Sequence, residues 1–424
     1  MLLVRERRMV YNTFGWDTVY VIDVNFVNAA LQREKLPALE YTSDGTEMTG
    51  AMGSMQIVSG GSGKLLRMSF QVTQGSLVSK AVGNGSLDGV TLVADLELTL
   101  LPSGIPTSKN LVPYIRQVSS QTGPGLLTPV NLLDPGKHLS PGQHALVFAL
   151  LPQFLVSVAP QITFVLATVN FARPATNFWL APVKADYAFM HKDDGSNYLG
   201  ILAVTTERDV SNLQRTIDDQ IVSGSNNAGL FIAESLFMEN VIVPVLERAY
   251  PDAGKSNFYW TGREIKARRS FGAGSVKKGA ITYHPRINSF DLTLVGGTLD
   301  TSLSGDCDLK AGIHMSYDAS SSNSSRFDTK NKLLTFASDP HPHFHKDVHI
   351  PWYWIFGGVV VEAIVQLVAR LIGNAIADAL QGEQGVRLAQ TPPASIQWSH
   401  TTNIDVRNAG LNGLFYMQGM VAQQ

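Results

Sequence analysis

Residues 353–380 read YWIFGGVVVEAIVQLVARLIGNAIADAL, and this stretch predicts a helix about 42 Å long at 1.5 Å per residue. Its polar side chains recur at every fourth position, on one slanting row of the helix surface; they are Glu362, Gln366, Arg370, Asn374 and Asp378. Nearly all other residues in it are apolar or small, which reverses the usual pattern of an apolar stripe on a polar helix. Such a helix needs cover on most of its circumference, from a curled sheet, a lipid bilayer or a partner protein.

Two further helices are predicted. One spans about 15–31 and is expected to be capped by Asn12 or Thr13. The other spans about 228–250 and is apolar around most of its circumference. Pro244 should kink this helix, because proline has no amide hydrogen to donate.

Strands dominate the rest of the chain. Within 64–74, Leu66, Met68 and Phe70 fall on one face and polar residues on the other, and 90–100 repeats this alternation. Period two with one polar face is typical of antiparallel sheet over a core. The other predicted strands are 145–158, 162–170, 198–205, 290–295, 309–317, 395–400 and 414–421. Proline and glycine repeatedly break 102–142, which predicts an irregular excursion, and SSSNSSR at 320–326 predicts a flexible loop.

Composition limits the function. Charged residues make up only 16% of the 424 residues, against the roughly 25% usual for soluble domains. A net charge of -2 argues against nucleic acid as a partner. The single cysteine, Cys307, excludes a disulfide within the chain.

The N-terminus lacks the long apolar core of a secretory signal, so we expect synthesis in the bacterial cytoplasm. The length indicates two or three domains. The placement of the predicted helices divides the chain into two units, 10–250 and 251–424, with the junction at 250–254.

Two segments carry a family resemblance. Residues 12–20 (NTFGWDTVY) and 235–244 (SLFMENVIVP) resemble the forty-seven-kilodalton accessory proteins of OrfX-type botulinum neurotoxin gene clusters. The similarity is greatest in 1–30 and around 230–265. It implies an α+β fold of the tubular lipid-binding (TULIP) superfamily, with strongly curved antiparallel sheets wrapped around long apolar helices and an apolar groove between them.

The same resemblance implies a role as a non-enzymatic accessory to a toxin, through lipid or membrane contact. Relatives occur beside toxin genes in several bacteria, insecticidal toxins included, and release together with a toxin complex is then expected. The family supplies no catalytic residues. The chain agrees with this, since Gly60-Gly-Ser62-Gly63 lacks the Gly-x-Ser-x-Gly spacing of a hydrolase. No enzyme and no cofactor are predicted.

A ligand wall is predicted from the direction in which side chains face. We expect a lipid or another long apolar ligand to contact six residues. These are Leu66, Met68, Phe70, Leu236, Phe237 and Val241. The alternative is ordinary core, which is the more common fate of such side chains.

A membrane contact is predicted at the main basic cluster, which comprises Arg263, Lys266, Arg268 and Arg269, with Lys277 and Lys278 further along. Each base near an anionic membrane surface contributes about 1 kcal/mol to binding. The alternative is a solvated hairpin face. The aromatic run 352–354 is a second possible interface anchor, or else a plug at the end of the core.

The histidine run 341–349 is the best metal candidate. In an extended strand His341, His343, His345 and His349 would share one face, as zinc requires. Pro342 favours a polar loop instead, and we predict no metal. Two other functions stay open. One is a protein-binding scaffold of a toxin complex without a lipid cavity, and the other is a pore-forming component that inserts 352–380 into a bilayer.

Overall fold

The computed structural model describes residues 10–220, 222, 224–309, 312–350, 357–380 and 387–424. The chain packs into two compact units. The 13–230 unit also contains 393–405 and 419–424, and the 231–392 unit also contains residues 10–12 and 406–418. These units are discontinuous in sequence, unlike the continuous ranges 10–250 and 251–424 expected above, because late segments pair with early strands. Ile396, for example, lies opposite Val169 in an antiparallel pair.

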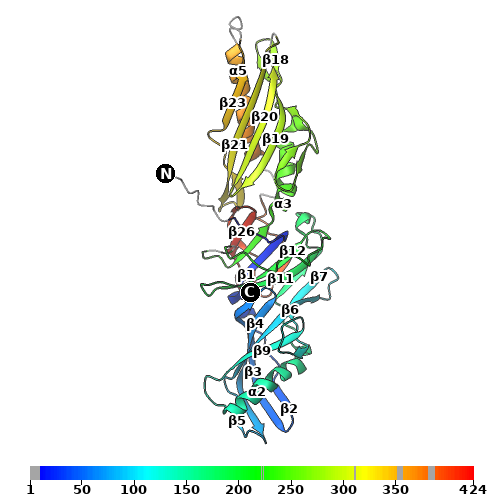
Figure 1. Ribbon diagram of the computed structural model, residues 1–424, viewed down its shortest axis with the longest axis vertical. Coiled ribbons are helices and arrows are strands. Elements are labelled where there is room, and N and C mark those ends of the chain that lie inside the picture. The colour runs from blue at the N-terminus through cyan, green and yellow to red at the C-terminus, as the bar shows by residue number, and fades with distance from the viewer. Residues whose placement is uncertain (1–9, 221, 223, 310–311, 351–356, 381–386) are drawn as a thin grey trace. The chain divides into compact units, whose positions relative to one another are not determined.

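The main sheet of the 13–230 unit has the order β2-β3-β4-β6-β7-β10-β24, with β5, β8 and β9 alongside. The strands are β2 (Leu39–Ser43), β3 (Thr46–Ser62), β4 (Leu65–Ser79), β5 (Gly85–Ser86), β6 (Thr91–Pro102), β7 (Ser108–Pro113), β8 (Gln117–Val118), β9 (Leu126–Leu133), β10 (Ala167–Asn170) and β24 (Ile396–Trp398). The register between β3 and β4 shifts at three places. Such bulges bend and twist a strand, and these long strands are accordingly strongly curved (Figure 1). The alternation predicted for 64–74 is confirmed, since Leu66, Met68 and Phe70 are fully buried.

A second sheet has the order β11-β12-β1-β13-β26-β25. Its strands are β11 (Lys184–His191), β12 (Asn197–Val204), β1 (Thr18–Asp23), β13 (Ala228–Ile232), β26 (Phe415–Met420) and β25 (Asp405–Leu411). The predicted helix 15–31 is therefore wrong in its first half, where β1 stands, and only α1 (Val24–Leu31) is helical. Its cap is Asp23, whose carboxylate accepts a hydrogen bond from the amide of Asn25 at 2.8 Å. A strand that is buried on both faces has no alternation of apolar and polar residues, so its sequence pattern does not distinguish it from a buried helix.

The apolar run 145–158 was predicted as a strand and is part of helix α2 (Pro141–Ser157). A capping box starts this helix: Ser140 accepts from the amide of Gln143, and the Gln143 side chain accepts from the amide of Ser140. The short helices η1 (Ala159–Gln161) and η2 (Phe178–Leu180) follow. A continuous apolar run fits either period, and the Ser-x-x-Gln signal before it decides for helix.

The predicted helix 228–250 is also shorter than expected. Its first residues form β13, and the helix itself consists of α3 (Glu234–Phe237), a π-helical segment η3 (Met238–Ile242) and α4 (Val243–Ala249). Pro244 stands at the start of α4, directly after the π-helical segment, and has no amide hydrogen to donate to the preceding turn. The structure shows a π-helical segment just before the proline, and the kink itself stays a prediction.

The 231–392 unit is built on a sheet of order β14-β15-β19-β20-β21-β22, with β16 and β23 alongside. The strands are β14 (Phe258–Trp260), β15 (Ile265–Ala267), β16 (Phe271–Gly272), β19 (Arg286–Val295), β20 (Thr298–Asp308), β21 (His314–Asp328), β22 (Leu333–Phe336) and β23 (His343–Val348), and β17 (Val276–Lys278) pairs with β18 (Ile281–Tyr283). A short helix, η4 (Pro251–Ala253), precedes β14.

Helix α5 (Gly357–Leu380) lies along this sheet (Figure 1) and contacts β21, β22 and α4. Ile364, Val368 and Ile372 are fully buried, while Glu362 and Arg370 are exposed. The sheet and α4 therefore provide the cover that the apolar circumference of α5 requires. By length and composition α5 is also apolar enough to cross a membrane, a property that core helices of soluble proteins share.

The loop predicted at 320–326 is wrong, because these residues continue strand β21. Ala319, Ser321 and Asn323 point inward and are buried. The Asn323 amide donates to the carbonyl oxygens of Ala337 at 3.0 Å and Gly373 at 2.9 Å. The serine-rich composition therefore does not mark an irregular backbone here, and Asn323 is the residue that joins this strand to α5.

Candidate functional site

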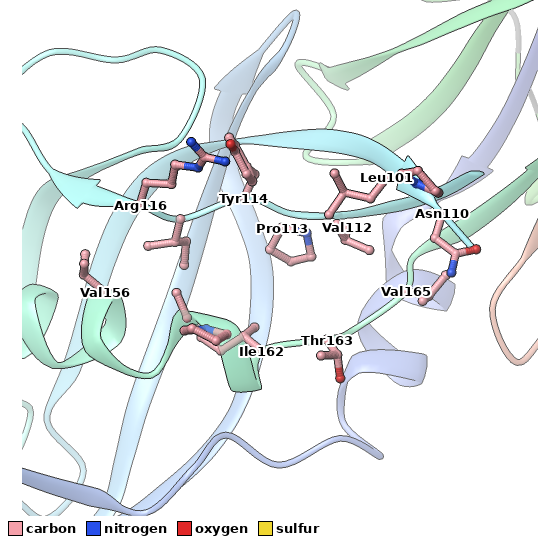
Figure 2. A pocket seen from close by; sticks show the side chains of 14 residues that line it. Leu101, Asn110, Val112, Pro113, Tyr114, Arg116, Val156, Ile162, Thr163 and Val165 are labelled. Atoms are coloured by element: carbon pink, nitrogen blue, oxygen red, sulfur yellow. The ribbon is translucent and has the colours of Figure 1, made fainter. Parts of the chain in front are cut away.

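A cavity of about 670 Å³ opens on the 13–230 unit (Figure 2), within the roughly 300–1,000 Å³ usual for ligand pockets. Three stretches of chain form it: the β6–β7 hairpin with the residues that follow it, the end of α2, and the segment after η1. Its lining residues are Leu101, Pro102, Asn110, Val112, Pro113, Tyr114, Ile115, Arg116, Val156, Ala159, Pro160, Ile162, Thr163 and Val165. The wall is mainly apolar.

Prolines lie near the ends of both walls of this cavity. On one side, β7 ends at Pro113, which lies opposite Leu98 of β6. On the other side, α2 ends at Ser157 and Pro160 follows. Proline cannot donate a backbone hydrogen bond; beyond Pro113 the amide of Tyr114 still donates to the carbonyl oxygen of Glu97 at 3.3 Å, and Pro160 stands within η1. Figure 2 shows Val156 and Ile162 on the side opposite Tyr114 and Pro113.

The polar groups of the cavity are few and separate. At one end, the Arg116 guanidinium lies over the Tyr114 ring, 4.8 Å from its centroid, and Arg116 is exposed. At the other end, the Asn110 side chain accepts a hydrogen bond from the Thr168 hydroxyl at 2.9 Å. A guanidinium suits a carboxylate or phosphate. An apolar wall with one cation at its rim can therefore hold an amphiphile with an anionic head.

A smaller cavity of about 270 Å³ shares Thr163 and Val165 with the first. It lies against α1, and its rim holds Glu34 and His400, 3.9 Å apart. The extended chain at 163–165 thus has an opening on each side. These residues come from stretches that proline and glycine interrupt, where sequence periodicity gives no signal.

The six residues predicted for the ligand wall do not meet in this cavity. Leu66, Met68 and Phe70 are fully buried in the 13–230 unit, whereas Phe237 and Val241 are buried in the 231–392 unit. Leu236 is half-buried. Phe237 stacks on Phe415, with ring centroids 4.9 Å apart. A role for any of them in ligand binding stays a prediction.

The predicted basic cluster lies on β15 and the residues around it. Lys266 forms ion pairs with Glu264 at 3.1 Å and Asp291 at 3.2 Å. The Arg268 guanidinium lies 4.2 Å from the centroid of the Tyr259 ring. Arg263 and Arg269 are exposed. Part of the positive charge is therefore balanced within the unit, and the membrane contact stays a prediction. The aromatic run 352–354 lies outside the described residues.

The histidines of the run 341–349 lie partly on a strand and partly in a loop. His343 and His345 lie on β23, and His341 is in the preceding loop. His341 and His343 line a polar cavity of about 390 Å³ together with Asp300 and Asp339. Among the described residues, no three His, Cys, Asp or Glu side chains come close enough together to hold a metal ion.

The chain is similar in sequence and in structure to proteins of one known family. The sequence model of the OrfX-like family, described as "Protein OrfX2/OrfX3/P47", matches residues 13–391. Protein P47 of Clostridium botulinum (strain Kyoto / Type A2) is 25% identical over 428 residues, covering 96% of this chain and 99% of the relative. Protein OrfX3 of the same strain is 22% identical and covers 72% of the chain and 71% of its own length. The solved structure of P47 from Clostridium botulinum A2 has a TM-score of 0.80 at 23% identity, over 97% of this chain and 99% of that chain.

Proposed function

Because the chain belongs to the OrfX-like family of OrfX2, OrfX3 and P47 proteins, we propose that it is a non-enzymatic accessory protein of a bacterial toxin that binds a lipid or another long apolar ligand. The family match indicates the toxin association, since the relatives that carry these names come from Clostridium botulinum and Paraclostridium bifermentans. Toxin-cluster proteins are then its protein partners, and it is released together with the toxin complex.

The cavity of the 13–230 unit is the observation that supports ligand binding. Its walls combine apolar side chains from three stretches of chain with one exposed cation, Arg116. Contact with an apolar wall stabilises a bound hydrocarbon chain by about 25 cal/mol per Å² of apolar surface removed from water. The Arg116 guanidinium would contact the head group. A TULIP-type fold, with curved antiparallel sheet around apolar helices, is consistent with this use.

The scaffold alternative requires that the cavity stays without a ligand. It is tested by native mass spectrometry of the 46.0 kDa protein as purified from cells, followed by solvent extraction and lipid analysis. We expect a co-purifying lipid or fatty acid in one-to-one ratio. Bare protein that takes up no lipid when lipid is offered would refute the proposal and favour the scaffold.

Two variants of helix α2 locate the ligand. Val156 lines the cavity, so Val156→Trp fills it and should displace the ligand. Ala149 is exposed on the same helix, and Ala149→Trp should leave the ligand bound. If both variants lose the ligand equally, or both keep it, then the ligand does not bind in this cavity.

The pore-forming alternative is tested with liposomes that contain a self-quenched dye. Because α5 packs on the sheet of its own unit, we expect no release of dye from neutral or acidic liposomes between pH 5 and 8. Rapid release would favour insertion of α5 into the bilayer.

A further inference from the structure

The segment 98–185 has an unusual charge. It contains five bases, Lys109, Arg116, Lys137, Arg173 and Lys184, and one acid, Asp134. Its formal net charge is therefore 5 − 1 = +4, whereas the whole chain carries -2. The segment includes α2, the β6–β7 hairpin and every residue that lines the 670 Å³ cavity. Four of its bases are exposed, namely Lys109, Arg116, Lys137 and Arg173, whereas Lys184 pairs with Glu207 at 3.7 Å.

The same segment holds much of the exposed apolar surface. Nine large hydrophobic side chains are exposed among the described residues, and five of them lie between 98 and 185. Two belong to the β6–β7 hairpin, where Leu101 is 43% exposed and Ile105, at the turn, is 63% exposed. The turn is closed by the amide of Ser108, which donates to the carbonyl oxygen of Ile105 at 3.0 Å. Ile105 is thus held outward by an ordered turn.

Two bases lie beside this hairpin. Lys109 lies opposite Pro102 on the hairpin, and its ammonium is 5.5 Å from the centroid of the Phe171 ring. The amide of Phe171 donates to the carbonyl oxygen of Thr107 at 2.7 Å, which places the exposed Arg173, two residues later, near the turn. Within the described part of the chain, neither Lys109 nor Arg173 forms an ion pair with a carboxylate.

We propose that the β6–β7 hairpin docks this protein on the surface of a bilayer that contains anionic lipids, with Ile105 inserted among the acyl chains. Apolar side chains flanked by bases are the composition that binds at such an interface. Two exposed apolar side chains on a narrow hairpin offer far less than the roughly 800 Å² per partner of a standard protein interface, so a protein partner fits the tip less well. Leu101 and Arg116 both line the cavity, so docking brings the cavity mouth to the lipid surface. This step rests on the proposed function, because a cavity mouth held at the lipid surface matters only if the cavity binds a lipid.

The test is sedimentation of the protein with vesicles of phosphatidylcholine alone and of phosphatidylcholine mixed with phosphatidylserine. We expect binding to the mixed vesicles that weakens as salt rises from 0.05 to 0.5 M, because salt screens the bases. Lys109→Gln and Arg173→Gln should each lower the partition coefficient about fivefold, and Ile105→Ser should lower it at least about tenfold.

A matched control exists in the other unit. Val295 is 56% exposed at the turn between β19 and β20, and Val295→Ser should leave vesicle binding unchanged. Equal losses in Ile105→Ser and Val295→Ser, or no binding by the wild-type protein to either vesicle, would overturn the proposal. So would binding that Arg268→Gln with Arg269→Gln abolishes while the hairpin variants retain it, because docking would then belong to the predicted basic cluster.

Native mass spectrometry separates this inference from the proposed function. Ile105→Ser protein should still carry its ligand when expressed in cells, although it fails to sediment with vesicles. Val156→Trp protein should sediment with vesicles but carry no ligand. A wild-type protein that carries lipid yet ignores vesicles overturns docking alone, and one that binds vesicles yet never carries lipid overturns the cavity assignment alone.

Discussion

The contact between Asn323 and α5 gives a sharp prediction about what holds the 231–392 unit together. Asn323 is fully buried, and its amide donates to the carbonyl oxygens of Ala337 and Gly373. Each such bond contributes about 1 kcal/mol net. The Asn323 carbonyl oxygen is buried without a hydrogen-bond partner, which is unfavourable. Removing this oxygen therefore offsets part of the stability lost with the two hydrogen bonds. Asn323→Ala should therefore lower the free energy of unfolding by about 1–3 kcal/mol.

Asn323→Asp should lower the free energy of unfolding more than Asn323→Ala does, although aspartate has the shape of asparagine. It replaces the donor with a second acceptor that faces two carbonyl oxygens, and ionisation would leave a buried, unpaired charge. We expect a loss of about 3–5 kcal/mol at pH 8 and less at pH 5, where protonation of the new carboxyl is easier. Burial raises the pKa of such a group, so the folded state is weakened as pH rises.

Urea unfolding followed by tryptophan fluorescence measures both losses, and hydrogen exchange of the α5 amides reports whether the helix loosens. Ser324 is the matched control, since it is exposed on the same strand and Ser324→Ala should change stability by less than about 0.5 kcal/mol. If Asn323→Asp is no more destabilising than Asn323→Ala, or if both unfold like the wild type, then the Asn323 bonds do not fasten α5 in solution.

Two further predictions concern titratable groups. Burial, without a charged partner, raises the pKa of Glu234 from 4.5 to about 7. The folded state holds this proton more tightly than the unfolded state, so stability should fall by about 1–2 kcal/mol as pH rises from 4.5 to 7, after discounting for partial exposure. Glu234→Gln should remove this fall in urea unfolding at pH 5 and 8, and an unchanged pH slope would contradict the assignment. Burial raises the pKa of the Cys307 thiol to about 11, with smaller contributions from Asp308 and Asp306. Because thiolate is the reactive form, iodoacetamide should label Cys307 much more slowly in native protein than in urea, as mass spectrometry would show; equal rates would refute this.

Where one face of an element meets core and the other meets water, the sequence was sufficient to predict it. The alternation of Leu66, Met68 and Phe70 with polar neighbours predicted β4, and the four-residue spacing from Glu362 to Arg370 predicted which row of α5 stays exposed. The strands predicted at 198–205 and 414–421 are confirmed as β12 and β26. Buried elements were ambiguous, because an element covered on all sides has no polar face to reveal its period.

The candidate site could not be predicted in the same way. Leu101, Arg116 and Val156 lie on separate segments, and only the pairing of β7 with β6 and the packing of α2 bring them around one cavity. Each of these residues is unremarkable in its local sequence.

The sequence by itself determined the apolar circumference of α5, the polarity of each alternating strand and the family, because these depend on which residues stand at which spacing. Only the tertiary structure decided that SSSNSSR at 320–326 continues strand β21. The reason is that the Asn323 amide donates to the carbonyl oxygen of Gly373 on α5, and local propensity contains no information about a neighbour 50 residues away in the chain.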